Sequence, residues 1–267
     1  MKIILGTANV KKKYGLSSNN LTLKEFGEVQ HYLKKNNFFL EVAEDYKNTK
    51  HTTNNKLKLF YKINFFKNQN NLIKINNLLK NKNLFCLMIH NIKSIKYEGF
   101  KKIYNYLIFL KSKKIIKSFG ISIYDLKDLN IIKNYNFDYI QIPLNIFNQT
   151  FNKRNTMQFR KKGTKFIARS IFFQGIVFDK RYLKLNSITL NNKIKKIQKE
   201  LFKKKINILE FCLNYIKINT WLWGFVIGVD KLDQLKHIKN FFQRKKFIHK
   251  YQKYRIYEKK IIDPRHW

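Results

Sequence analysis

Short apolar runs of β-forming residues recur along this chain, and stretches with helical periodicity separate them. We predict eight strands, at residues 3–8, 38–43, 57–63, 84–90, 118–123, 139–143, 165–172 and 224–229. Strands that alternate with helices form a parallel sheet. A closed barrel fits eight units better than an open doubly wound sheet, because no G-x-G-x-x-G turn follows the first run and the second half does not repeat the first. The prediction is a single-domain α/β fold, a (β/α)8 TIM barrel of 267 residues.

The helical patterns and the irregular segments divide the rest of the chain. Helices are predicted at 22–35, 71–80, 99–113, 126–134, 193–218 with a break, and 231–242. Three segments lack a regular pattern: 64–71, the loop 175–189 after the seventh strand, and the tail. We therefore predict a barrel at residues 1–246 and a C-terminal extension at 247–267 that packs on it.

The chain is strongly basic, with 56 Lys and Arg against 16 Asp and Glu and a formal net charge of +40. Such an excess raises the question of nucleic acid or an anionic membrane as partner. Lys, Asn, Ile, Phe and Tyr are frequent together, however, whereas there are 9 Gly and 2 Pro, a bias that an AT-rich genome produces without selection for a partner. The lysines are also dispersed, which is typical of a solvated surface. We interpret the charge as background.

The tail keeps a second interpretation open, because cations and aromatic residues alternate at 244–255. Such a pattern can bind a phosphate backbone and stack bases. No base-reading motif accompanies it. We favour an extension that packs on the barrel and do not expect nucleic acid as a partner, with a polyanion-binding protein as the alternative.

The cysteines and the apolar runs bear on compartment and membrane. Cys86 and Cys212 show neither a C-x-x-C pattern nor a Cys/His spacing, so we expect no disulfide framework and no metal site. The N-terminal apolar run is too short for a signal peptide, and no stretch reaches the length of a membrane span. We expect a soluble, cytoplasmic protein, and the sequence does not indicate its oligomeric state.

Polar residues follow or end the second, third and fourth predicted strands, where a barrel presents side chains to its functional face. Tyr46 comes just after the second run and follows three acids, Glu41, Glu44 and Asp45. These acids could belong to a functional site, or they could simply offset the charge of nearby lysines. Lys62 stands near the end of a buried run, and beside a phenol its ammonium would lower the tyrosine pKa. Glu41 is positioned to hold that lysine.

His90 closes the fourth run, and an imidazole there can hydrogen-bond a substrate carbonyl oxygen. A single histidine at such a place is more often a capped core residue. Taken together, however, a phenol, a cation, a carboxylate and an imidazole on successive strands form a set of groups that can donate a proton.

Several longer motifs resemble the aldo-keto reductases, and most closely a bacterial branch found in surface-sugar biosynthesis. The similar segments are LGTAN at 5–9 with YGL at 14–16, QIPLNIFNQ at 141–149, RSIFFQG at 169–175, IGVD at 227–230 followed by LDQL at 232–235, and IDPRHW at 262–267. The resemblance spans nearly the whole chain. It implies a barrel enzyme that reduces a small carbonyl or sugar-like substrate with a nicotinamide cofactor.

The resemblance also implies residue roles. Tyr46 would be the proton donor, Lys62 would lower its pKa, His90 would orient the carbonyl, and Glu41 would stand in the place of the family's aspartate. The cofactor-binding positions implied are Ser122, Gln141, Asn145, Arg169, Ser170, Gly228, Val229, Asp230 and Lys231.

For the dinucleotide we expect NADP, with NAD as the alternative. Lys231 and Arg169 would attract a 2′-phosphate, although Asp230 would repel one.

The chain departs from the family pattern around the tyrosine. Glu41 is one methylene longer than aspartate, Lys47 replaces a glycine, Lys50 replaces a glutamate, and Lys11 replaces another glycine. The carboxylate change alone is expected to cost about 1–3 kcal/mol of transition-state stabilisation, or roughly a ten- to hundredfold rate loss. A reductase of lowered activity is the prediction, and a catalytically impaired barrel that binds cofactor or ligand is the alternative.

Overall fold

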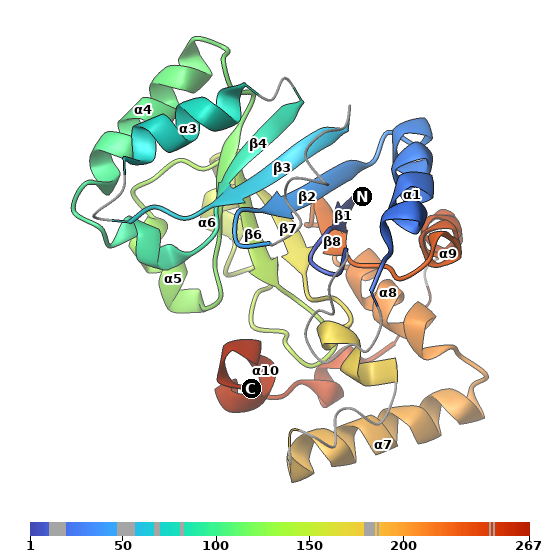
Figure 1. Cartoon of the computed structure of the whole chain (residues 1–267). Coiled ribbons are helices and arrows are strands. Elements are labelled where there is room, and N and C mark those ends of the chain that lie inside the picture. Colours follow the sequence, from blue (N-terminus) through green and yellow to red (C-terminus); the bar gives the residue numbers. More distant parts are fainter. Residues whose placement is uncertain are drawn as a thin grey trace.

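Eight parallel strands close into one barrel in the computed structural model (Figure 1), and each pairs with its neighbours in sequence order. The strands are β1 (Lys2–Gly6), β2 (Phe39–Ala43), β3 (Lys58–Ile63), β4 (Leu84–Ile89), β5 (Phe119–Ser122), β6 (Tyr139–Pro143), β7 (Lys165–Arg169) and β8 (Gly224–Ile227). The structure describes residues 1–10, 20–46, 57–66, 70–80, 83–178, 185, 187–245, 247 and 249–267. All eight predicted strands are present, so the predicted (β/α)8 TIM barrel is confirmed.

Helices surround the barrel (Figure 1). They are α1 (Leu23–Lys35), α3 (Asn71–Leu79), α4 (Phe100–Ser112), α5 (Leu126–Ile132), α6 (Met157–Lys161), α7 (Ile188–Lys203), α8 (Ile208–Ile218), α9 (Leu232–Gln243) and α10 (Lys259–Ile262). Local capping explains where α1 begins, because Thr22 accepts a hydrogen bond from the Glu25 N–H and Glu25 accepts one from the Thr22 N–H. In the described part of the chain, no helix combines the length and the apolar character that a membrane span requires.

Some predicted boundaries were wrong. The break predicted within 193–218 is present and separates α7 from α8, but α7 begins five residues earlier than predicted, at Ile188, because Ser187 caps it by accepting from the Leu190 N–H. The loop expected at 175–189 holds the end of the short 3-10 helix η2 (Phe173–Phe178), and residues 179–184 and 186 lie outside the described part. The tail, expected to be irregular, holds η4 (Tyr251–Tyr254), α10 and η5 (Pro264–His266).

Alternating residues of each strand point into the barrel and form layers. One set of these inward residues forms an apolar cluster of Ile4, Phe39, Phe60, Cys86, Met88, Tyr139, Ile167 and Val226. Two residues further along three of these strands, the inward positions carry Glu41, Lys62 and Gln141 instead. We call these two sets the apolar layer and the polar layer. The polar layer lies toward the carboxyl ends of the strands.

The C-terminal segment packs closely on the barrel. The Gln149 side chain donates a hydrogen bond to the Tyr251 carbonyl, and the Ile256 N–H donates one to the Phe147 carbonyl. Tyr254 is fully buried. The division into units at 1–246 and 247–267 stays a prediction.

Candidate active site

The polar layer is a buried ion pair with an amide across it. Lys62 Nζ lies 2.7 Å from Glu41 Oε1, and the two side chains are 5% and 3% exposed. Gln141 donates to the other Glu41 oxygen through its amide nitrogen and accepts from Lys62 Nζ through its carbonyl oxygen, at 3.3 Å. Each charged group therefore has a second partner besides its counter-ion, which is what makes a buried pair tolerable.

Strand register brings these groups together. β2 pairs with β3, so that Glu41 lies opposite Phe60 and Ala43 opposite Lys62. The two side chains are therefore one pleat apart on adjacent strands and both face the barrel interior. The longer carboxylate side chain of Glu41 keeps the ion pair with Lys62, so the extra methylene does not displace the lysine.

Tyr46 lies in the turn after β2, where its N–H donates to the Ala43 carbonyl at 2.9 Å. Lys62 Nζ is 5.9 Å from the centre of the Tyr46 ring. Burial, followed by the Glu41 carboxylate, raises the pKa of the Tyr46 phenol, while Arg169 acts in the opposite direction. The net shift of the phenol pKa is therefore upward, and the role of Lys62 in lowering it stays a prediction. Lys62 is matched by Glu41, so its charge does not outweigh the desolvation of the phenol.

His90 follows β4 and meets Tyr46 edge to face, with ring centres 6.4 Å apart. Burial, and next the Lys62 charge, lower the pKa of His90 to about 4, although Asp45 and Glu41 act to raise it. The imidazole is therefore neutral at pH 7. Its Nδ1 lies 2.9 Å from Asp45 Oδ2, off the axis that a hydrogen bond requires.

The acids before Tyr46 divide between two tasks. Glu44 pairs with Lys74 at 2.7 Å, which is the charge-offsetting arrangement considered from the sequence. Asp45 instead approaches His90 and accepts a hydrogen bond from the Asn64 side chain at 2.8 Å. Of the substituted loop positions, Lys11, Lys47 and Lys50 lie outside the described residues.

Arg169, at the end of β7, is held beside the carboxyl end of β5. Its Nε donates to Ser122 Oγ at 3.3 Å, and its Nη2 donates to the Ile123 carbonyl at 3.2 Å. Its guanidinium carbon lies 3.9 Å from the centre of the Tyr124 ring, and that of Arg265 lies 3.8 Å from the same ring. Cation–π contacts therefore join the C-terminal segment to the wall of the site.

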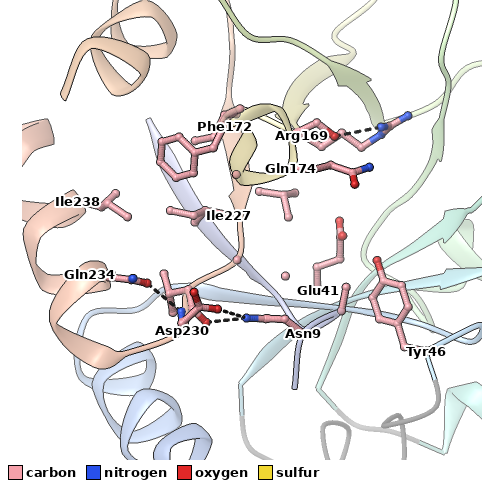
Figure 2. Close-up of a pocket in the computed structure, with 18 of the residues that line it drawn as sticks. Asn9, Glu41, Tyr46, Arg169, Phe172, Gln174, Ile227, Asp230, Gln234 and Ile238 are labelled. Atoms are coloured by element: carbon pink, nitrogen blue, oxygen red, sulfur yellow. Dashed lines mark hydrogen bonds between the residues drawn. The ribbon is translucent and has the colours of Figure 1, made fainter. Parts of the chain in front are cut away.

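The loop after β8 is fixed by an amide from the loop after β1. Asn9 Nδ2 donates to the Val229 carbonyl at 2.9 Å and to Asp230 Oδ1 at 3.1 Å, and the Asp230 N–H donates to Gln234 Oε1 at 2.8 Å. Figure 2 shows Asp230 and Gln234 grouped near Asn9, with Glu41 and Tyr46 on the other side of it. Three elements thus form this part of the wall.

One pocket of about 270 Å³ connects these groups. Its lining includes all four predicted catalytic residues, namely Glu41, Tyr46, Lys62 and His90, and six of the predicted cofactor-binding residues, namely Ser122, Arg169, Ser170, Gly228, Val229 and Asp230. The other three predicted cofactor-binding residues, Gln141, Asn145 and Lys231, are not part of its lining.

The structure gives these three residues other surroundings. Gln141 is fully buried and holds the Glu41–Lys62 pair. Asn145 shapes its own loop, because its amide donates to the Ser170 carbonyl and its oxygen accepts from two backbone N–H groups, at 2.9 and 3.0 Å. Lys231 is exposed and lies where its charge acts on Glu25 of α1.

The lining fits a phosphate-bearing ligand near β8. A Cβ built at Gly228 would meet only Asn9 Oδ1, at 3.7 Å, so the absent side chain leaves open space in the wall. The first turn of α9 has no side-chain cap, which leaves backbone N–H groups for an anion. Phosphate sites of barrel enzymes form at these same loops.

The described parts of the chain contain neither a metal-binding cluster nor a reactive thiol. No group of three or more His, Cys, Asp or Glu side chains there is arranged to hold a metal ion. Both cysteines are free and buried, and burial raises the pKa of each thiol. A buried neutral thiol is inert.

Several lining residues were not predicted from the sequence. Asn9, Tyr124 and Gln234 belong to the pocket, as does Phe172 before η2. Their roles depend on contacts between loops far apart in the chain, such as that of Asn9 with Asp230. The structural role of Gln141 had a visible signal, because it is a polar residue inside the apolar strand of residues 139–143.

Comparison with known proteins agrees with the architecture. Two forms of an aldo-keto reductase from Bacillus halodurans superpose with TM-scores of 0.66 (holo) and 0.65 (apo), at 13% and 14% identity. The matches cover 92% and 91% of this chain and 88% and 93% of the other. A putative aldo-keto reductase from Pseudomonas aeruginosa gives 0.62 at 10% identity, covering 90% and 88%. None of the curated protein sequences matches the chain.

Polar groups at the carboxyl ends of a closed parallel barrel define the class of (β/α)8 barrel enzymes. The sequence model of the aldo/keto reductase family matches residues 67–256, more than half of the chain. The chain therefore belongs to the aldo/keto reductase family, a family of oxidoreductases.

Proposed function

We propose that the protein is an NAD(P)H-dependent reductase of a small carbonyl compound, with Tyr46 as the proton donor and the cytoplasm as its location. The observation that carries the proposal is the convergence of Tyr46, Lys62 and His90 in one pocket. Family membership supports the oxidoreductase class. A reduced nicotinamide, when bound, supplies hydride to the carbonyl carbon.

Tyr46 completes the reduction in this scheme. Hydride addition turns the carbonyl oxygen into an alkoxide, which is a stronger base than a phenolate. The Tyr46 O–H bond breaks, the proton passes to that oxygen, and the phenolate takes its next proton from solvent. The raised pKa of Tyr46 keeps the phenol protonated before the step, and the ammonium of Lys62 stabilises the phenolate after it.

His90 and the polar layer have positioning roles. The neutral imidazole of His90 has one N–H that can be donated to the substrate oxygen. Glu41 and Gln141 hold the Lys62 ammonium in place from two sides. Because every member of this layer is bonded to another, the ammonium does not have to reorient during the reaction.

The test is Tyr46→Phe, with Tyr61→Phe as the matched control. Tyr61 is a buried phenol of β3 that does not line the pocket. We expect Tyr46→Phe to lower the reduction rate by about 10²–10⁴-fold. Dinucleotide binding, followed by quenching of protein fluorescence, should change by less than about twofold, and Tyr61→Phe should keep its rate.

Two results would contradict the proposal. Unchanged reduction by Tyr46→Phe would show that another group donates the proton. A wild-type protein that binds dinucleotide but reduces none of a panel of small aldehydes, ketones and sugars would instead be the catalytically impaired barrel.

A further inference from the structure

We propose that Asp230 makes this site select NADH over NADPH. The inference rests on the proposed function, because it assumes that a nicotinamide dinucleotide occupies the pocket. It goes against the NADP preference expected from Lys231 and Arg169. The carboxylate of Asp230 lies in the pocket lining and is held there by the Asn9 amide at 3.1 Å.

The pocket lining indicates which end of a bound dinucleotide would meet Asp230. Hydride transfer requires the nicotinamide to lie beside Tyr46 and His90. The pyrophosphate would then lie near the loops after β7 and β8, where Gly228 leaves room and α9 begins. The adenosine half would continue past this point toward Asp230 and Gln234, which Figure 2 shows beside Asn9.

The cations that could attract a 2′-phosphate there are directed elsewhere. Among the described residues, Lys62, His90 and Arg169 are the only basic side chains that line the pocket. Arg169 is bonded to Ser122 and Ile123, at the carboxyl end of β5.

The lysines of the α9 region are also engaged outside the pocket. Lys236 pairs with Asp233 at 3.0 Å, and Lys239 donates to Asn36. Lys231, whose charge acts on Glu25, does not line the pocket.

The remaining polar groups suit a ribose hydroxyl. A carboxylate accepts hydrogen bonds from hydroxyl groups and is the group with which dinucleotide sites commonly hold the ribose of NAD. The same carboxylate repels a 2′-phosphate, and like charges in contact at a binding interface are strongly unfavourable. Asn9 already occupies one lone pair of Asp230, which fixes the orientation of the carboxylate.

The experiment compares Asp230→Asn with Asp233→Asn. Asp233 is on the same α9 region, its side chain is 86% exposed and it does not line the pocket, so its replacement makes the same change in net charge. NADH and NADPH are titrated into each protein and followed by fluorescence. Adenosine 5′-monophosphate and adenosine 2′,5′-bisphosphate are then used as competitors that probe the adenosine end alone. Circular dichroism confirms that each variant is folded.

We expect the wild-type protein to bind NADH about tenfold or more tightly than NADPH. Asp230→Asn should reduce that ratio by about tenfold, mainly by improving NADPH binding, and Asp233→Asn should leave it unchanged. The bisphosphate should compete more weakly than the monophosphate only when Asp230 is present.

The outcomes separate the two proposals. The role of Asp230 would be overturned if the wild-type protein bound both dinucleotides equally or bound NADPH more tightly. It would also be overturned if Asp230→Asn did not change the ratio of the two affinities. The proposed reductase function would stand in each case. Failure of the wild-type protein to bind either dinucleotide would overturn the proposed function, and this inference with it. If Asp230→Asn does not fold, competition by the two nucleotides against the wild-type protein still tests the proposal. Tighter binding of adenosine 2′,5′-bisphosphate than of adenosine 5′-monophosphate would contradict it.

Discussion

Two layers inside one barrel follow opposite physical rules. In the apolar layer, aromatic rings meet at 5–6 Å, as Phe60 does with Phe39 at 5.5 Å and with Tyr139 at 5.3 Å. Two positions further along the same strands, the polar layer holds Lys62, Glu41 and Gln141 in specific contacts. Apolar packing has no fixed partners, so it tolerates exchange of similar volumes. A buried ion pair does not, because removal of one member leaves a charge without a partner.

The largest effect is expected from Lys62→Met. It leaves the Glu41 carboxylate buried and without its counter-ion, which should lower the free energy of unfolding by about 3–5 kcal/mol. Reduction should fall by at least a hundredfold as well, since the phenolate of Tyr46 loses the ammonium that lies 5.9 Å from its ring centre. Urea unfolding followed by circular dichroism measures the first effect, and steady-state kinetics the second.

Two further variants control this experiment. Lys58→Met changes an exposed lysine of the same strand, β3, and should alter stability by less than about 0.5 kcal/mol. The double variant Glu41→Gln with Lys62→Met removes both charges, so it should recover much of the stability but none of the activity. If Lys62→Met unfolded at the wild-type urea concentration, the polar layer would be as tolerant as the apolar one, and the comparison would fail.

A pH effect of intermediate size is expected from His90. Its pKa is about 4 in the folded protein against 6.5 for an ordinary histidine. Between these values the unfolded chain binds a proton that the folded chain does not, so stability is full above pH 6.5 and falls as the pH decreases toward 4. The loss should reach about 2–3 kcal/mol. His90→Gln should remove this part of the slope, measured as the melting temperature from pH 7.5 to 4.5.

Other groups titrate nearby, so the comparison must be made between variants. Hydrogen bonds from Lys253 and Tyr254 outweigh the burial of Glu200 and lower its pKa to about 2. Protonation of Glu200 therefore also destabilises the folded protein as the pH falls, but below 4.5. That effect is common to wild type and His90→Gln and cancels in their difference. A His90→Gln slope equal to that of the wild type would show that His90 is not buried in the neutral form.

The fold could be predicted from the sequence because it depends on local patterns. Each of the eight strands is an apolar run, and the segments between them show helical periodicity. The boundary errors arose where a helix cap or a tertiary contact determines where an element begins or ends. Ser187 starts α7 by capping it, and α6 (Met157–Lys161) is too short to show periodicity.

The site could be predicted only in part. The positions of Tyr46, Lys62 and His90 followed from the strand ends, because a barrel brings those ends to one face. The direction of the Tyr46 pKa did not follow, since it depends on how much the phenol is desolvated and on whether Glu41 matches the lysine. The Asn9–Asp230 contact joins residues 221 positions apart, which no local pattern predicts.

The smallest effect tests the apolar layer itself. Phe60→Leu removes a ring that meets Phe39, Phe85, Tyr139 and Trp223, but it leaves an apolar side chain that can repack. We expect a loss of about 1–2 kcal/mol in the free energy of unfolding, with no new dependence on pH. Reduction should stay within about twofold, because the polar layer keeps all its bonds.

The decisive measurement is the ratio of the activity change to the stability change in Phe60→Leu and in Lys62→Met, assayed at a temperature where both remain folded. A large activity loss in Phe60→Leu would mean that aromatic packing two positions below Lys62 sets the position of its ammonium. The two layers would then act as one unit, and the partners of Lys62 could not by themselves explain how it is held.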